Sequence, residues 1–370
     1  MRNTGMKNTR VKNISMIGVS LGFLLFGALL TIGQSASASE YEGCTVNEFE
    51  ASGKLERRLA HGAYGQWNDT FSESMITVND PQQKPVEYYS ISKQPVNAEP
   101  HQLVLFLHGF PEFAWAWEEQ LEYFGDEYHA VALDLKGHHY SAKPKSIAEY
   151  DFIKLARELK EVVRCLGYES LTLVGHDFGG VLAYTFGMLY PEMLNGMVIL
   201  NAPHPYIFGR EYNNPEGDQK EKSKYMEYAQ GDGVFDQTKF FKIMFSDDAL
   251  LGSDFYAGKR KLRLMGEGWS SLSAWNRMKS YYRAMDFPPS ANEYKPTPSQ
   301  MQKSMMTIHA PTLVLWGEND PYMSNKLLDG LEEFVPELEV KRFPEHTHWI
   351  THELTDLNLY LEEFLNQHSK

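Results

Sequence analysis

The chain has 370 residues, of which 42% are apolar and 13% aromatic, so it can bury the core of one large α/β domain with an insertion, or of two domains. That composition excludes an intrinsically disordered chain. The net charge of −14 at pH 7 argues against nucleic acid or an anionic membrane surface as a partner.

The N-terminus is typical of a targeting segment. Basic residues come first, an uncharged run follows over 14–33, and Ala36-Ser37-Ala38 offers a small-residue cleavage pattern. We therefore predict a secretory signal peptide over 1–38, with export to the periplasm or the exterior, and an N-terminal extension over 39–70. Because the apolar run is long, an uncleaved membrane anchor stays open as the alternative.

The chain has two cysteines, Cys44 and Cys165. Export would permit a disulfide between them. However, Cys165 falls on a predicted helix, where a small buried thiol is the simpler interpretation. We expect two free or merely structural cysteines, and nothing in the sequence has the spacing of a zinc site.

From residue 71 onward, strand-like and helix-like stretches alternate. Apolar or alternating runs predict strands over 73–79, 86–92, 101–110, 129–137, 171–177 and 196–203. The stretches between them predict helices over 113–124, over 147–167 with Gly167 closing it, and from Phe178 onward. Strands separated by helices imply a mostly parallel sheet with helices on both faces.

The alternation stops after residue 203 and returns near residue 310. Residues 204–302 are aromatic, methionine-rich and mostly helical in pattern, without a run typical of a buried strand. The rhythm then resumes with a strand over 310–320, a helix over 325–335, a strand over 338–343 and a helix over 354–367. We predict a core of residues 71–202 and 303–370, interrupted by a helical cap over 203–302.

One turn in this pattern carries an acid. Gly175 and Gly179 flank Asp177 in "GHDFG", between a predicted buried strand and a helix. That outline is the nucleophile elbow of α/β enzymes, where the central residue is usually serine. Asp177 could instead cap the following helix, but the flanking glycines favour a nucleophile.

Three strand ends carry candidate chemistry: Asp177, Asp320 in "WGEND" and His348 in "EHTHW". Ligands of such sheets bind at the carboxyl ends of the strands, and nucleophile, acid, histidine is the chain order of an α/β-hydrolase triad. A carboxylate nucleophile forms an ester at an electrophilic sp³ carbon, so its targets are epoxides and alkyl halides. A histidine oriented by an acid would then activate water against the ester.

Several motifs together resemble the epoxide hydrolases of the α/β-hydrolase superfamily, from about Phe71 to the C-terminus. They are "HGFPE" (108–112), "DLKG" with "SAKP" downstream, "GHDFGG", "NAPHP", "WGEND" and "HW". The resemblance implies an α/β-hydrolase fold, with a mostly parallel central sheet flanked by helices and an inserted helical cap. It belongs to the branch whose nucleophile is aspartate.

The resemblance assigns roles within the triad. It selects Asp320 over Glu318 as the orienting acid. The other place where relatives carry the acid holds Asn201, which cannot serve as one. It selects His348 as the base because Trp349 follows it, although Thr347 stands where the family has glycine. The rival histidines, which we expect on the surface or in loops, are His346 and His352.

The "HGFPE" loop is expected to complete the site. As the family implies, the backbone amides of Phe110 and Phe178 would form an oxyanion hole. Pro111 is expected to follow a cis bond. His108 and Glu112 are expected to brace the loop rather than to react.

Two cap tyrosines would donate hydrogen bonds to the epoxide oxygen. "SYYRAM" resembles the family element that contains one of them, which points to Tyr282, with Tyr281 as a neighbouring decoy. "SKYMEYAQ" resembles the element with the other, which points to Tyr225, with Tyr228 as its decoy. Both could instead be ordinary packing aromatics.

Halide chemistry is the alternative for the same nucleophile. Many haloalkane dehalogenases place tryptophan directly after the nucleophile, but this chain has Phe178 there, and residues 178–184 contain no arginine to hold a haloacid. The sequence therefore favours an exported hydrolase of epoxides. A dehalogenase and a secreted non-catalytic binding protein on the same fold stay open as alternatives.

Aromatic residues near these motifs predict an apolar pocket and hence a lipophilic epoxide as substrate, with water as co-substrate. The expected pocket residues are Phe113, Trp115 and Trp349. No metal or organic cofactor is implied, because neither the nucleophile nor the activated water needs one. The natural substrate and the oligomeric state do not follow from the sequence.

Overall fold

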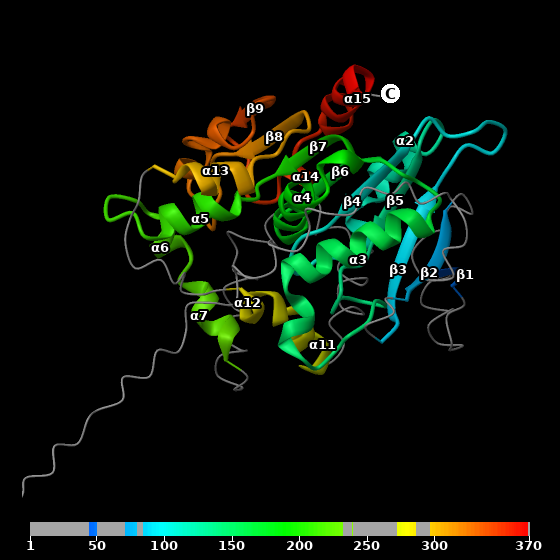
Figure 1. The fold of residues 1–370 in the computed structure, drawn as a ribbon, viewed down its shortest axis with the longest axis horizontal. Helices are drawn as coiled ribbons and strands as arrows, with labels where there is room; N and C mark the ends of the chain where they lie inside the picture. The colour runs from blue at the N-terminus through cyan, green and yellow to red at the C-terminus, as the bar shows by residue number, and fades with distance from the viewer. Residues whose placement is uncertain are drawn as a thin grey trace, which may run out of the picture. The chain divides into compact units, whose positions relative to one another are not determined.

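A nine-stranded sheet forms the centre of the computed structural model (Figure 1). The structure describes residues 44–49, 71–79, 84–231, 239, 272–285 and 297–368, all within the unit Gly43–Lys370. The expected leader over 1–38 and most of the expected extension lie outside the described residues. No described helix is long and apolar enough to span a membrane.

The strands run in the order β1-β2-β3-β5-β4-β6-β7-β8-β9. Their bounds are Cys44–Glu48, Ser72–Val78, Val86–Lys93, Leu103–Leu107, His129–Leu133, Leu171–His176, Leu194–Leu200, Thr312–Gly317 and Leu338–Phe343 for β1 to β9. Pairing is antiparallel among β1, β2, β3 and β5, and parallel from β5 through β4 to β9. The predicted mostly parallel sheet is confirmed.

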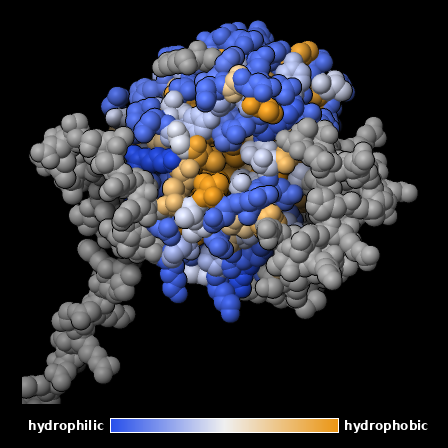
Figure 2. Space-filling model, turned by 90° about the vertical axis from the view of Figure 1, so that its right-hand side faces the viewer, coloured by the Kyte–Doolittle hydropathy of each residue, from blue (hydrophilic) through white to orange (hydrophobic). Residues whose placement is uncertain are grey.

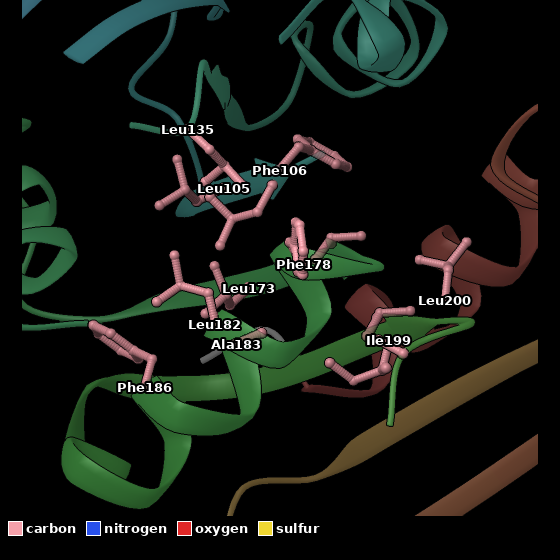
Figure 3. Close-up of a cluster of buried hydrophobic side chains, with 14 of the residues drawn as sticks. Leu105, Phe106, Leu135, Leu173, Phe178, Leu182, Ala183, Phe186, Ile199 and Leu200 are labelled. Carbon is pink, nitrogen blue, oxygen red and sulfur yellow. The ribbon is translucent and has the colours of Figure 1, made fainter. Parts of the chain in front are cut away.

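Buried strands form the middle of the sheet, as their unbroken apolar runs require. Every residue of β4, β6 and β8 is buried. Figure 3 shows one cluster of the core, to which β4, β6, β7, the loop after β5 and α4 (Phe178–Leu189) contribute. Its labelled members are Leu105, Phe106, Leu135, Leu173, Phe178, Leu182, Ala183, Phe186, Ile199 and Leu200.

Helices cover the sheet. α3 (Phe152–Cys165) begins where the Asp151 carboxylate accepts the backbone N–H groups of Ile153 and Lys154, an N-cap. It packs on α4, while α2 (Glu118–Phe124) and α15 (Leu357–His368) are joined by a hydrogen bond from Gln120 to Asn358. Gly167, with φ of 87°, follows α3 where the sequence predicted its end.

Two predictions about elements need correction. The helix expected over 325–335 is a pair of short 3₁₀ turns, η4 (Asn325–Leu328) and η5 (Leu331–Glu333). Gly330 separates them because it adopts a left-handed φ of 77°, which no α-helix accommodates. Strand β1 was not expected either, since its five mostly exposed residues show no apolar run.

The described helices between β7 and β8 fall within or next to the predicted cap. They are α5 (Pro205–Tyr212), α6 (Gln219–Lys222), α7 (Tyr225–Gln230), α11 (Leu272–Met278), α12 (Ser280–Ala284) and α13 (Gln300–Met306). Much of the cap sequence lies outside the described residues. Figure 1 shows α7, α11 and α12 on the side of the sheet where α3 lies.

The described part of the face in Figure 2 is mostly hydrophilic, with hydrophobic residues gathered near its middle. The exposed large hydrophobic side chains are mostly spread over separate parts of the chain, such as Val96 in the loop after β3, Ile153 of α3 and Leu359 of α15, although Met301 and Met305 share α13. Most apolar side chains of the described chain are instead in the core.

The structure joins Cys44 of β1 to Cys165 of α3 in a disulfide, with Cα atoms 5.8 Å apart. Our expectation of two free cysteines was therefore wrong. The reason is that β1 adds to the edge of the sheet beside α3, which brings together two residues 121 positions apart in sequence. Nothing in the sequence of β1 indicated that this segment pairs with the edge of the sheet.

Reduction of this disulfide is expected to lower the free energy of unfolding by about 2–5 kcal/mol, because the unfolded chain gains conformational entropy. Urea unfolding with and without reductant, with thiol counting, measures the change. A Cys44→Ala, Cys165→Ala double variant should be as unstable as the reduced protein and insensitive to reductant. An unchanged free energy after complete reduction would contradict this expectation.

Candidate active site

Asp177 lies in a strained turn at the end of β6. Its φ of 49° and ψ of −118° are rare for a residue with a side chain, and its carboxylate makes no capping bond to α4. A Cβ on Gly179 would lie 2.2 Å from the carbonyl oxygen of Leu107, and one on Gly175 2.5 Å from that of Gly179. Only glycine therefore allows the chain to turn this tightly and to present Asp177 at the carboxyl end of the sheet.

The two oxygens of the Asp177 carboxylate have different surroundings. Oδ1 accepts the backbone N–H of Phe110 at 2.8 Å, and Oδ2 lies 3.6 Å from Nε2 of His348. Burial alone would raise the pKa of Asp177, but the hydrogen bond and charge of His348 lower it below its usual value. Asp177 is thus a carboxylate in which Oδ1 is hydrogen-bonded to the backbone and Oδ2 faces the imidazole of His348.

His348 follows β9 and lies between two carboxylates. Its Nδ1 is 2.6 Å from Oδ2 of Asp320, which follows β8. Oδ1 of Asp320 accepts the backbone N–H groups of Tyr322 and Met323 at 2.7 and 2.9 Å. Burial alone would lower the pKa of His348, but Asp320 and Asp177 raise it to about 10.

Asn201, at the end of β7, supports the acid. Its Nδ2 donates to Oδ2 of Asp320 at 2.7 Å and to the carbonyl of Gly317 at 3.0 Å. Its Oδ1 accepts the N–H of Gly317 at 2.8 Å. The sequence showed only that Asn201 is not an acid, whereas the structure shows an amide that holds the acid in place.

The rival residues lie elsewhere. Glu318 pairs with Arg342, away from the imidazole. The ring of His346 packs on Phe343. His352 is not a surface or loop residue, as we expected, but pairs on the short helix α14 (Ile350–Glu353) with Glu112, its side chain only 2% exposed.

Thr347, which stands where the family has glycine, is accommodated by a neighbour. Its N–H and hydroxyl both donate to the carboxylate of Glu353, at 2.7 and 2.5 Å. Its own Oγ1 accepts the N–H of Trp349 at 3.2 Å. These bonds hold the loop in which His348 lies.

The residues expected to brace the "HGFPE" loop do so. Nε2 of His108 accepts the N–H of Leu135 at 2.9 Å. Glu112 lies between the rings of His176 and His352. The bond between Phe110 and Pro111 is cis, as predicted.

Tyr225 and Tyr282 come from α7 and α12, and the structure brings them together at the elbow. Their ring centroids are 5.8 Å apart, and Tyr282 contacts the ring of Phe178 at 4.7 Å. Burial is the main cause that raises the pKa of both phenols, and the charge of Asp177 contributes to both shifts. Both phenols are therefore in the protonated form, in which they can donate a hydrogen bond.

The two neighbouring tyrosines make different contacts. Tyr281 stacks on Phe178 at 5.0 Å and contacts Tyr150 at 5.5 Å, and its hydroxyl has no hydrogen-bond partner within the described chain. Tyr228 lies under the ammonium group of Lys239. A third tyrosine, which the sequence did not single out, joins the site: Tyr322 contacts His348 and Tyr225, both at 5.2 Å.

Aromatic rings line the side of the site next to the elbow. Phe110 contacts Trp275 of α11 at 5.2 Å and Tyr282 at 5.4 Å. Of the three predicted pocket residues, Trp349 packs beside His348 at 5.2 Å. Phe113 instead packs on His139 and Trp115 on Phe71.

The sequence did not single out Trp275, which lies five residues before the "SYYRAM" element and outside it. Among the described residues, no three His, Cys, Asp or Glu side chains are placed to hold a metal ion. The described site therefore consists of a carboxylate, an imidazole–carboxylate pair, buried phenols and aromatic rings.

The raised pKa of His348 predicts a pH dependence of stability. Because its folded pKa of about 10 exceeds the ordinary 6.5, the stabilisation from its protonated form is full below about pH 6.5 and is lost as pH rises through about 10. The difference in unfolding free energy between wild type and His348→Gln should shrink over that range. Urea titrations at pH 6, 8 and 10 test this, and a difference independent of pH would contradict it.

Comparison with known proteins shows similarity in sequence. The model of the family described as alpha/beta hydrolase fold matches residues 102–353. Epoxide hydrolase 4 of Homo sapiens is 31% identical over 277 residues, which cover 72% of this chain and 73% of that protein. Epoxide hydrolase 2 of Caenorhabditis elegans is 24% identical over 303 residues, covering 78% of this chain and 79% of that protein.

Solved structures agree. A Bacillus megaterium epoxide hydrolase in complex with an inhibitor matches with a TM-score of 0.63 and 31% identity, over 76% of this chain and 97% of that one. An epoxide hydrolase from metagenomes of hot environments matches with a TM-score of 0.67 and 27% identity, over 79% of this chain and 98% of that one.

Proposed function

The chain belongs to the epoxide hydrolases of the α/β-hydrolase family, and on that premise we propose that it converts a lipophilic epoxide to a vicinal diol through a covalent ester on Asp177. One observation carries the proposal. The Asp177 carboxylate lies 3.6 Å from the imidazole of His348. The ring of Tyr282 contacts Phe178, the residue next to Asp177, at 4.7 Å and the ring of Tyr225 at 5.8 Å. The proposed nucleophile, base and proton donors are thus gathered at the elbow.

In the first step, Oδ2 of Asp177 attacks a ring carbon of the epoxide. The ring C–O bond breaks, its electron pair moves to the oxygen, and the phenols of Tyr225 and Tyr282 hydrogen-bond and protonate that oxygen. Oδ2 is the attacking oxygen because Oδ1 is held by the amide of Phe110 at 2.8 Å. The ester therefore forms with Oδ1 as its carbonyl oxygen, already beside an N–H donor.

Ester formation also changes the state of His348. Two carboxylates hold its pKa near 10 in the free protein. The ester is neutral, so one of the two charges disappears and the pKa of His348 falls. The imidazole then gives up its proton, which returns to the phenol that protonated the ring oxygen, and it becomes a base, oriented by Asp320 at 2.6 Å.

In the second step, His348 removes a proton from water, whose oxygen attacks Cγ of the ester. Negative charge develops on Oδ1, where the N–H of Phe110 stabilises it, together with the N–H of Phe178 at the start of α4. The intermediate collapses by breaking the bond between Cγ and Oδ2. Oδ2 takes the proton of the newly added hydroxyl group and leaves as part of the diol, so Asp177 regains its carboxylate with an oxygen from water and His348 is again protonated.

The leaving group is inferred from the donors. Epoxide opening produces an oxyanion that needs hydroxyl donors, and Tyr225 and Tyr282 supply them. A halide would need a donor such as the indole found after the nucleophile in many dehalogenases, but Phe178 occupies that position. The rings of Phe110, Phe178 and Trp275 favour a lipophilic substituent on the epoxide.

The intact mass of a His348→Gln variant tests this function. After incubation with a panel of epoxides and haloalkanes, the protein should gain the whole mass of an epoxide, and peptide mapping should locate it on Asp177. A gain only with haloalkanes, equal to the substrate less hydrogen halide, would refute the epoxide assignment. An additional Asp177→Asn substitution is the control and should abolish the adduct.

Removal of either phenol is expected to slow ester formation with an epoxide. Tyr282→Phe and Tyr225→Phe should each lower the rate about 10²-fold, since each removes one donor to the developing oxyanion. Stopped-flow single-turnover measurements give the rate. Tyr281→Phe is the matched control and should keep it, because that hydroxyl has no partner in the described chain. Equal rates for all three variants would exclude the phenols from the reaction.

We further propose that the chain is exported, with residues 1–38 removed. The sequence pattern of the leader supports this, and so does the disulfide between Cys44 and Cys165, because disulfides persist mainly in oxidising compartments. N-terminal sequencing of the protein from culture supernatant or periplasm should begin near Ser39. Recovery of a reduced protein that keeps its N-terminus inside the cell would refute export.

A further inference from the structure

A buried glutamine connects the cap to the loop that carries the acid. Gln219, the first residue of α6, is 1% exposed. Its Nε2 donates to the carbonyl of Tyr322 and to Oγ of Ser223, both at 2.9 Å, and its Oε1 accepts the N–H of Ser324 at 2.8 Å. Both ends of the amide are therefore satisfied, and two of its bonds cross between segments more than 100 positions apart in sequence.

On the core side, these bonds hold the loop that contains Asp320. The N–H of Tyr322 donates to Oδ1 of Asp320 at 2.7 Å, while its ring contacts His348 edge-on at 5.2 Å. Gln219 binds the carbonyl of this same residue. It thus holds a residue that contacts both members of the imidazole–carboxylate pair.

On the cap side, the bonds of Gln219 lead to Tyr225. Ser223, which accepts from Gln219, also accepts the N–H of Met226 through its carbonyl at 3.0 Å, in the first turn of α7. Tyr225 begins that helix, and its ring contacts the ring of Tyr322 at 5.2 Å. The amide of Gln219 therefore binds both the loop that holds Asp320 beside His348 and Ser223, which precedes the helix of Tyr225.

Other hydrogen bonds cross the same boundary between residues 216–223 and residues 320–326, which we call the seam, but they are less buried. Lys222 donates to the carbonyl of Asp320 at 2.5 Å, and Lys326 to that of Glu216 at 2.9 Å. Water can replace a bond made by an exposed ammonium group at little cost, whereas a buried carbonyl or N–H left without its partner is costly. Gln219 is thus the contact in this seam whose loss should move α7 relative to the acid loop.

We propose that Gln219 is a positioning residue that sets Tyr225 at the correct distance from Asp177 and His348 for ring opening. The role rests on the proposed function. Its effect should be greater on ester formation than on ester hydrolysis. Asp320 keeps its bonds to Asn201 and His348 when Gln219 is lost, whereas the segment before Tyr225 loses its buried hydrogen bonds to the loop that carries Asp320.

The test is a double-mutant cycle on the rate of ester formation, measured by quenched intact mass in the His348→Gln background with styrene oxide as the probe. Gln219→Met keeps the length of the side chain and removes its hydrogen bonds. We expect it to slow ester formation by about 10- to 100-fold, as a displaced catalytic group does. In the Tyr225→Phe background, the same substitution should slow it less than about twofold, because there is no hydroxyl left to misplace.

Gln120→Met is the matched control. Gln120 is also buried and also joins distant elements, through its bond to Asn358 at 2.9 Å, but it lies between α2 and α15. It should lower the melting temperature without changing the rate of ester formation. If Gln219→Met does not fold, Gln219→Glu retains an acceptor for Ser324, loses the donor to Tyr322 and should show the same coupling to Tyr225.

The outcomes separate the two proposals. Equal losses with Tyr225 present and with Tyr225→Phe, both in the His348→Gln background, or an unchanged rate in Gln219→Met, would overturn the role of Gln219 alone. If the His348→Gln protein forms no ester with styrene oxide or any other epoxide, the proposed function fails, and the role of Gln219 fails with it.

Discussion

Replacement of Asp177 by asparagine is expected to abolish turnover, with kcat falling by about 10⁴- to 10⁶-fold, the range seen when a triad residue is removed. The amide oxygen carries no full negative charge and cannot displace the ring oxygen of an epoxide. The substitution keeps the size of the side chain, and asparagine tolerates the positive φ of 49° at this turn. Diol formation measured by chromatography gives the loss.

The fold should survive this change, because asparagine still offers an oxygen to the N–H of Phe110. Near-ultraviolet circular dichroism should match the wild type. Deamidation would restore aspartate, so the intact mass must be checked for a gain of one unit before residual activity is interpreted. Turnover within tenfold of the wild type by a protein that remains asparagine would refute the carboxylate nucleophile.

Replacement of His348 by glutamine is expected to separate the two steps. Ester formation should continue within about tenfold of the wild-type rate, while hydrolysis of the ester slows by about 10⁴-fold because the base for water is gone. A single-turnover experiment should then show consumption of one epoxide per protein and almost no diol. Rapid-quench chromatography of substrate and product measures both rates.

His346→Gln is the control for this prediction. His346 is two residues away, but its ring packs on Phe343 rather than between the carboxylates. Its steady-state rate should stay within about twofold of the wild type, as for a residue outside the reaction. If ester formation and diol formation slowed by the same factor in His348→Gln, the imidazole would act in the formation of the ester rather than in its hydrolysis.

Much of the fold follows from local sequence signals. Unbroken apolar runs such as 103–107 and 171–176 predict buried parallel strands, and the structure confirms them as β4 and β6. Sequence patterns failed to predict an element where its structure depends on a distant contact or on the backbone conformation of a single residue. The disulfide of Cys44 depends on β1 reaching the edge of the sheet, and the expected helix over 325–335 breaks because one residue, Gly330, adopts a left-handed φ.

The site shows the same division. Residues that lie inside motifs, such as Asp177, Asp320 and His348, could be selected as candidates from their chain order and from the family resemblance. Their supports could not be identified. Asn201 and Gln219 act through amide hydrogen bonds to partners more than 100 positions away, and an amide in a sequence gives no sign of which carbonyl it will meet.

One measurement tests the covalent mechanism most directly: a single turnover of styrene oxide in H₂¹⁸O, with the wild-type protein in excess. Oδ2 of Asp177 should leave with the product, so the diol should contain no ¹⁸O and the Asp177 carboxylate should gain one ¹⁸O atom. Both are read by mass spectrometry. A diol that contains ¹⁸O, with none in the protein, would mean that water attacks the epoxide directly and that no ester forms on Asp177.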